Sequence, residues 1–174
     1  MHTDGSYQVL EWILLLVALL TQAGQPLKLM VSLEMLAYTS PSQDDPHPAM
    51  RAVYGDRGGF IALVANARAG LLLPGLARAM GRHVPTKVLP VPNGGRGIPD
   101  VRLSDHSPFW DQGYDALMVT DTSFMRNPHY HQMSDTVETL DLPFFCGVVE
   151  GLVAALGRAL ARPTNRFNPS KLCA

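Results

Sequence analysis

Polar side chains that can bind metal or move protons gather in three segments, and the densest covers residues 127–136, NPHYHQMSDT. This predicted loop between a strand and a helix holds His129, Tyr130, His131 and Asp135. A neutral imidazole binds zinc, and a neighbouring carboxylate can fix which ring nitrogen carries the proton. Because His129 and His131 alternate, they face opposite ways in an extended segment, so we expect at most one of them to be a metal ligand. A structural role for a loop histidine is the alternative.

The second segment is residues 33–36, LEML, which places Glu34 inside an apolar run. A carboxylate in such a run is costly unless it is paired or bound to a cation. Two interpretations stay open. Glu34 either binds a cation, or it stands at the end of a strand, where its carboxylate reaches solvent or an arginine.

The third segment is residues 104–109, SDHSPF, with Asp105 directly before His106 and Pro108 two positions later. An aspartate in this position is typical of the residue that caps a short helix. From these residues alone, structural capping is the interpretation that we favour.

The elements that must position these side chains alternate along the chain. Apolar runs predict strands, and helical spacing or length predicts helices. We expect a strand over residues 27–36 that is central and buried on both faces, and a helix over 142–161 that is capped by Asp141. The other expected elements are helices over 9–23 and 70–81, strands over 59–66, 86–91 and 116–120, a surface loop over 38–48, and a flexible connection over 92–99. This alternation predicts one three-layer α/β domain.

Composition narrows the class of protein. The chain has 174 residues and a formal net charge of -1, so it shows no electrostatic footprint for nucleic acid or for an anionic membrane. The run at residues 12–20, WILLLVALL, is about half the length of a membrane span and lacks a basic flank, which favours a helix buried in the core. No targeting signal is recognised, and a cytoplasmic location is the default expectation. Cys146 is predicted to be a buried free thiol and Cys173 to be exposed.

Together the polar segments resemble a known family. Residues 104–141, SDHSPFWDQGYDALMVTDTSFMRNPHYHQMSDTVETLD, resemble the C-terminal signature of the di-zinc aminopeptidases of metallopeptidase family twenty-eight. That family also includes glutaminyl cyclases and glutamate carboxypeptidase II. LEMLAY at residues 33–38 and GDRGGFIALVAN at residues 55–66 resemble its earlier segments in the same order. The resemblance implies a mixed, mostly parallel sheet flanked by helices, as in the zinc-peptidase and phosphorylase-like fold.

The resemblance also implies a chemistry, which is hydrolysis of the N-terminal bond of a peptide or small amino-acyl substrate by two zinc ions that share a water. It makes Glu34 a ligand of one zinc and His131 a ligand of the other, with Asp135 as a support or cap. It places Asp105 and His106 on the wall of the substrate pocket.

The resemblance further makes Tyr130 a donor to a substrate oxygen. Family members also carry an adjacent Glu-Glu pair, which supplies the general base and a zinc ligand. No two adjacent glutamates occur in this chain, and its His-x-Asp triplet, residues 2–4, lies too close to LEMLAY for the layout of the family. One hypothesis is that an internal stretch has been lost and that Asp4 is the remnant of the aspartate that bridges the zincs.

We therefore expect residues 1–174 to form one truncated or internally deleted aminopeptidase-like domain with an incomplete metal site. A catalytic zinc normally has three protein ligands, whereas Glu34 and His131 would give one to each ion. The alternative is an inactive remnant or an interaction module of the same fold. Acyl transfer of the glutaminyl-cyclase kind is a third option. An exposed sheet edge and face favour self-association.

Overall fold

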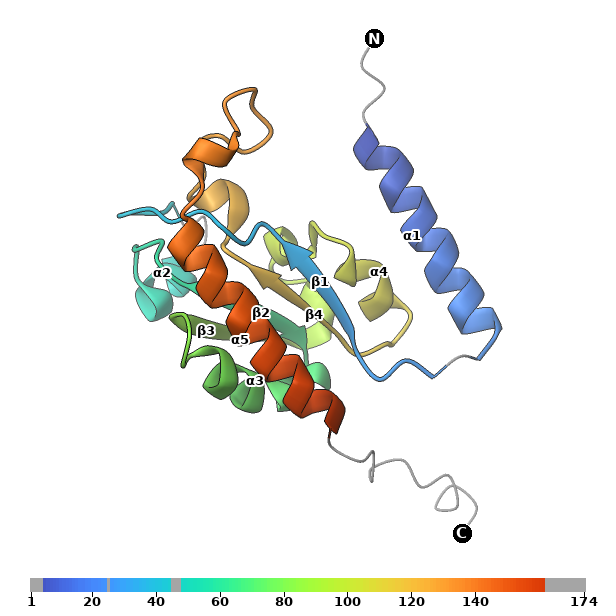
Figure 1. Cartoon of the computed structure of the whole chain (residues 1–174). Coiled ribbons are helices and arrows are strands. Elements are labelled where there is room, and N and C mark those ends of the chain that lie inside the picture. Colours follow the sequence, from blue (N-terminus) through green and yellow to red (C-terminus); the bar gives the residue numbers. More distant parts are fainter. Residues whose placement is uncertain (1–4, 25, 45–47, 162–174) are drawn as a thin grey trace.

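The computed structural model of the chain describes residues 5–24, 26–44 and 48–161. Four strands and five α-helices alternate along it, joined by short 3-10 turns (Figure 1). The strands are β1 Met30–Glu34, β2 Ile61–Asn66, β3 Thr86–Val91 and β4 Ala116–Thr120. The helices are α1 Gly5–Gln22, α2 Pro48–Tyr54, α3 Leu73–Met80, α4 His106–Asp111 and α5 Leu142–Ala161. The predictions on Asp4 and Cys173 lie outside the described residues.

One mixed sheet orders the strands β1-β4-β2-β3. The pairs β1–β4 and β2–β3 are parallel, whereas β2 and β4 are antiparallel. Every residue of β4 and all but the last of β2 are buried, as expected of apolar strands covered on both faces. The expected fold class, a mostly parallel α/β sheet flanked by helices, is confirmed.

Alternate residues of the central strands pack into two separate cores, one on each face of the sheet, because successive side chains of a strand point to opposite faces. Leu63 and Val119 pack against α3 and α5 on one face of the sheet. Val64 and Met118 belong to the second core, which contains residues of α4 and Val17 of α1. Helices α3 and α5 therefore cover one face of the sheet and α4 covers the other (Figure 1).

The predicted central strand at residues 27–36 is instead an edge strand. β1 pairs only with β4 among the described strands, and Leu33 is 54% exposed. The apolar run correctly predicts a strand, but it does not reveal that the strand order leaves one side of β1 without a neighbour. The exposed edge that the sequence predicts is therefore found at β1.

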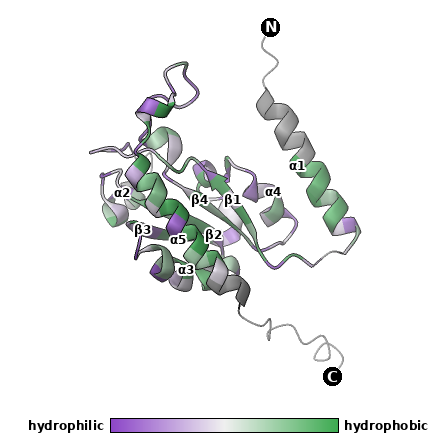
Figure 2. Cartoon of the chain, in the orientation of Figure 1, coloured by the Kyte–Doolittle hydropathy of each residue, from purple (hydrophilic) through white to green (hydrophobic). Residues whose placement is uncertain are grey.

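The helix predicted at residues 9–23 forms as α1, but its burial in the core is wrong. Val17 is 2% exposed, whereas four leucines on the helix are each about half exposed, namely Leu14 51%, Leu15 49%, Leu16 50% and Leu19 53%. Figure 2 shows this apolar stretch beside the sheet, near α4, rather than within a layer. Across the part of the chain that the structure describes, no helix is both long and apolar enough to span a bilayer.

Helix α5 begins where the sequence predicts. The backbone N–H of Phe144 donates to Asp141 Oδ1 at 3.0 Å, which is the expected cap, and Thr39 Oγ1 donates to Asp141 Oδ2 at 2.7 Å. The predicted burial of Cys146 is wrong, because this thiol is exposed. Cys146 lies two residues before the buried Val148, which is roughly 200° around the helix, so the two side chains face opposite ways.

The predicted flexible connection at residues 92–99 is instead folded into short helical turns. Asn93, Gly94 and Gly95 all have positive φ there, and an added Cβ on Gly95 would lie 2.8 Å from the side chain of Val101. The backbone thus passes close to its neighbours, which explains the glycine.

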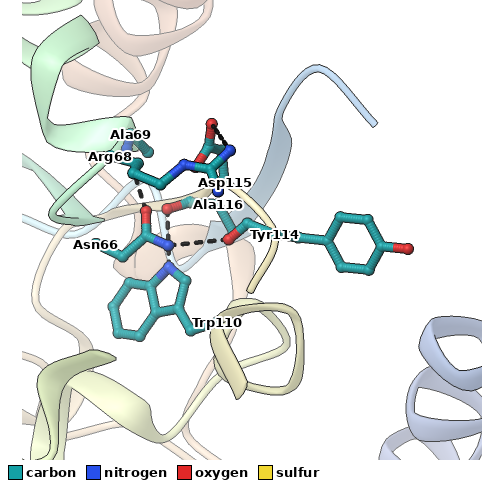
Figure 3. Close-up of polar contacts among 7 residues, drawn as sticks. All are labelled: Asn66, Arg68, Ala69, Trp110, Tyr114, Asp115 and Ala116. Carbon is teal, nitrogen blue, oxygen red and sulfur yellow. Dashed lines mark hydrogen bonds and ion pairs between the residues drawn. The ribbon is translucent and has the colours of Figure 1, made fainter. Parts of the chain in front are cut away.

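Side-chain bonds to backbone hold the end of the sheet that lies away from Glu34 (Figure 3). Asn66 Nδ2 donates to the carbonyl of Tyr114 at 2.9 Å. Trp110 Nε1 donates to the carbonyl of Ala116 at 2.9 Å. These bonds tie the carboxyl end of β2 and the start of β4 to the α4 segment, and α4 is thereby fixed against the sheet.

Candidate functional site

A largely apolar cavity lies on the α4 face of the sheet. Its volume is ≈ 810 Å³, including the open solvent at its mouth. All four strands contribute to its wall, together with α2, the turn at Pro99–Arg102 and the loop after β4. The polar or charged side chains that line it are Glu34, Gln43, Tyr54, Lys87, Asp100, Ser104, Thr120, Thr122, Ser123 and Tyr130.

The strand register explains how distant residues share this cavity. Glu34 pairs with Thr120, Thr120 with Ala62, and Ala62 with Lys87, so these four residues form one row across the whole sheet. Paired residues of neighbouring strands point to the same face. All four line the cavity, and we call them the floor row.

Glu34 ends β1 at one side of the floor row. Its Oε2 accepts a hydrogen bond from Ser104 Oγ at 3.0 Å, and Ser104 Oγ lies 2.9 Å from Ser32 Oγ. Among the described residues no arginine or lysine forms an ion pair with Glu34. Of the two interpretations left open by the sequence, pairing with an arginine is therefore not found, and the carboxylate stands at the cavity wall.

Asp105 and His106 do not line the cavity. His106 is 0% exposed, its Nε2 donates to the carbonyl of Val101 at 2.7 Å, and its ring lies 4.2 Å from that of Trp110. Burial lowers the pKa of His106 from 6.5 to about 4, so the ring is neutral at pH 7. Asp105 precedes α4 but makes no side-chain cap, so the capping prediction is wrong. Roles of Asp105 and His106 in substrate binding stay predictions.

The histidine loop brings one of its predicted residues to the cavity. Tyr130 lines it, while His131 is exposed, has φ 57° and stacks on the Tyr130 ring at 4.0 Å. His129 is tied within the loop, where its Nδ1 lies 3.0 Å from Ser134 Oγ. Asp135 is exposed. The structure therefore brings Glu34 and Tyr130 together and leaves His131 outside.

A metal centre is not assembled by the described residues. Within residues 5–24, 26–44 and 48–161 no three His, Cys, Asp or Glu side chains form a group that could hold an ion. Since a catalytic zinc normally has three protein ligands, the described residues alone do not form the zinc site that the resemblance implies.

Two buried charges that the sequence did not single out fix the loops around the cavity. Asp121 is 0% exposed and accepts hydrogen bonds from the backbone N–H groups of Ala37, Tyr38 and Ser123 at 3.1, 2.8 and 2.9 Å. Burial raises the pKa of Asp121, against the lowering effect of these bonds and of Arg126. The carboxylate thereby joins the segment after β1 to the segment after β4.

Arg126 likewise joins the loop after β4 to Gln43 and Phe60. Its Nη1 donates to the carbonyl of Phe60 at 2.9 Å, its Nη2 to Gln43 Oε1 at 3.0 Å, and its Nε to Thr122 Oγ1 at 2.9 Å. Burial lowers the pKa of Arg126 to about 10, although Asp121 opposes this shift. The sequence signal for both residues was an acid and a base five positions apart inside the quoted signature.

Comparison with known proteins relates the fold of this chain to that of an aminopeptidase. No protein-family model matches the sequence. Two crystal structures of LapA from Legionella pneumophila, one described as an aminopeptidase, superpose on the chain with TM-scores of 0.56 and 0.60 at 21% and 20% sequence identity. They match 87% and 91% of this chain and 36% and 39% of their own chains. The chain shares its fold with this aminopeptidase.

A curated relative in sequence is YfbL of Escherichia coli strain K12, an uncharacterized protein. It is 36% identical over 135 residues, which are 76% of this chain and 42% of YfbL. The chain thus spans about two fifths of the length of the proteins that it matches. Its similarity to LapA concerns the fold.

Proposed function

We infer that the chain is the peptide-binding part of a metallopeptidase-like domain whose zinc site is incomplete within these 174 residues. The observation that supports this proposal is the cavity, whose largely apolar wall also carries Glu34 and Tyr130. In this proposal Glu34 accepts the ammonium group of a peptide, and the Tyr130 hydroxyl donates to a peptide carbonyl. The apolar wall receives the first side chain of the peptide, as is usual for a ligand cavity.

A zinc ion held by a complete site would lower the pKa of a bound water and polarise the scissile carbonyl. Glu34 and His131 alone do not provide the ligands that such an ion needs, and no glutamate adjoins Glu34 as a base. We therefore derive no hydrolytic step and expect these residues to bind a peptide without cleaving it. Further ligands and a base would have to come from another polypeptide segment.

Metal analysis and an aminopeptidase assay on the same sample test this proposal. With added zinc, we expect less than one equivalent of tightly bound metal and no hydrolysis of leucine p-nitroanilide. Two equivalents of zinc together with turnover would show that the site is complete and overturn the proposal.

Calorimetric binding of a leucine-initiated peptide tests the role of Glu34. We expect Glu34→Gln to weaken binding about tenfold or more, because it removes a charge-assisted hydrogen bond. Glu150→Gln is the matched control, since Glu150 lies on α5 across the sheet and its side chain is 69% exposed. Equal losses in the two variants would contradict an amine site at Glu34.

A non-catalytic interaction module is the second candidate, and the open edge of β1 favours it. Leu33 is exposed on a strand that has a described neighbour on one side only. Such an edge can pair with another strand. A folded chain that self-associates in sedimentation experiments and binds no peptide would support this candidate over the first.

A further inference from the structure

The two ends of the floor row carry opposite charges. Glu34 lies on β1 and Lys87 on β3, the two outer strands of the sheet, and register places both side chains on the same face. Three strand spacings of about 4.8 Å separate their Cα atoms by about 14 Å. Thr120 and Ala62 lie between them without charge. The floor row therefore carries a negative charge at one end, Glu34, and a positive charge at the other, Lys87.

Lys87 makes the basic end. Its Nζ lies 3.8 Å from the centroid of the Phe60 ring and donates to the carbonyl of Tyr54. An ammonium group has three donors, so others remain beyond that bond. Among the described residues no carboxylate lies within 4.0 Å of this ammonium.

A second cation strengthens the basic end. The Arg126 guanidinium lies 4.6 Å from the same Phe60 ring. Burial, and then the charge of Arg126, lower the pKa of Lys87. A bound anion beside Lys87 would relieve the repulsion between these two cations, since opposite charge favours the protonated amine. The basic end is thus suited to a carboxylate.

The acidic end is made by Glu34, whose carboxylate accepts one hydrogen bond, from Ser104. A carboxylate has room for several donors, so an ammonium group can be added there. Asp100, on the turn Pro99–Arg102, is a further acid of the cavity wall outside the floor row. Charge along the floor row, from Glu34 to Lys87, thus matches that of a zwitterion.

We propose that the cavity selects short peptides of three to four residues with both ends free, binding the ammonium group at Glu34 and the terminal carboxylate at Lys87. This selection rests on the proposed peptide binding and adds a length and a C-terminal requirement to it. An extended peptide advances about 3.3–3.5 Å per residue, so about 14 Å accommodates roughly four residues. Lys87 Nζ lies over the ring of Phe60, which directly precedes the inner strand β2, so the span left for the ligand is shorter and the best length is about three residues.

Calorimetry without zinc separates the two ends of the ligand. The probes are the tripeptide Leu-Ala-Leu, its C-terminal amide, its N-acetyl form, and a hexapeptide that begins with Leu-Ala-Leu. We expect amidation to weaken binding at least tenfold, since a charge-assisted bond is lost, and the hexapeptide to bind at least tenfold more weakly than the tripeptide. Equal affinity for acid and amide in the native chain, or for the two lengths, would overturn the proposal.

The variants assign the effect to Lys87. In Lys87→Met the preference for acid over amide should fall to within twofold, whereas Lys28→Met, at an exposed position before β1, should keep it. A preference that survives in Lys87→Met would also overturn the proposal. The N-acetyl peptide reports on Glu34 alone, so loss of binding on acetylation without any effect of amidation refutes the length and carboxylate requirement but keeps the proposed function.

Discussion

Lowering the pH from 7 to 5 should destabilise the folded chain by about 2 kcal/mol through His106 alone. The ring is 0% exposed, and its Nδ1 has no hydrogen-bond partner while its Nε2 donates to Val101. Protonation would bury a charge and an unpaired N–H. Burial is the main cause that lowers the pKa of His106 from 6.5 to about 4; the bond to Val101 opposes it, and the charge of Arg102 adds to it.

The sign follows from proton binding by the two states. Between pH 6.5 and pH 4 the unfolded chain takes up a proton at His106 that the folded chain does not. The contribution to the free energy of unfolding is therefore fully present above pH 6.5 and is lost as the pH falls toward 4. The full difference corresponds to about 3 kcal/mol, of which about 2 kcal/mol is lost by pH 5.

Urea unfolding at pH 7, 6 and 5 measures this effect in the native chain and in His106→Gln. The variant should be less stable at pH 7 by roughly 1–3 kcal/mol, because packing and a hydrogen bond change, but it should lose about 2 kcal/mol less than the native chain on acidification. His83→Gln removes an exposed imidazole and serves as the control. Identical pH dependence in the native chain and in His106→Gln would refute the reasoning. If His106→Gln does not fold, NMR titration of the native ring decides, and a midpoint near 6.5 contradicts burial of the neutral form.

Three further predictions concern stability and assembly. Asp141→Ala removes the cap of α5 and should lower the free energy of unfolding by about 1–2 kcal/mol in urea titrations; an unchanged midpoint would mean that the cap contributes nothing. Gly95→Ala should cost more than about 1 kcal/mol, because φ is +72° and the new methyl would lie 2.8 Å from Val101, while Gly97→Ala, in open space, should be nearly neutral. Similar losses in both would argue against the close approach. Leu33→Lys charges the edge of β1 and should shift any self-associated chain toward monomer in sedimentation; an unaltered distribution would exclude that edge as the contact.

The central strands were predictable because burial on both faces leaves a mark in the sequence itself. Residues 61–66 and 116–120 are short, apolar and bounded by polar or turn residues, and they form β2 and β4. β1 has a similar composition, yet its exposure depends on which strands lie beside it. The exposure of a strand thus depends on its neighbours in the sheet, which its own residue types do not reveal. The burial of Cys146 was predicted wrongly for a related reason, because residues that are adjacent in the sequence of a helix face different directions.

The candidate site was predicted in part. Glu34 stands out in the sequence as a polar residue in an apolar strand, whereas Tyr130 was singled out by the resemblance to the family; both line the cavity. Lys87 was not predicted, since a lysine near the start of an edge strand is ordinary. Its relation to Glu34 appears only through the register of three strand pairs, which no local pattern contains.

The pairing of β1 with β4 has a consequence for synthesis of the chain on a ribosome. Met30 pairs with Ala116, so β1 has to wait for a neighbour that is made roughly 90 residues later, which takes about 5–18 s at bacterial and eukaryotic elongation rates. β2 and β3, with α3 between them, can associate earlier because their partners are close in sequence. Pulse-labelled hydrogen exchange during refolding should register this order, with protection of β2 and β3 before β1. Until β4 is made, β1 therefore lacks its neighbour in the sheet, and chaperones have access to it in the interval.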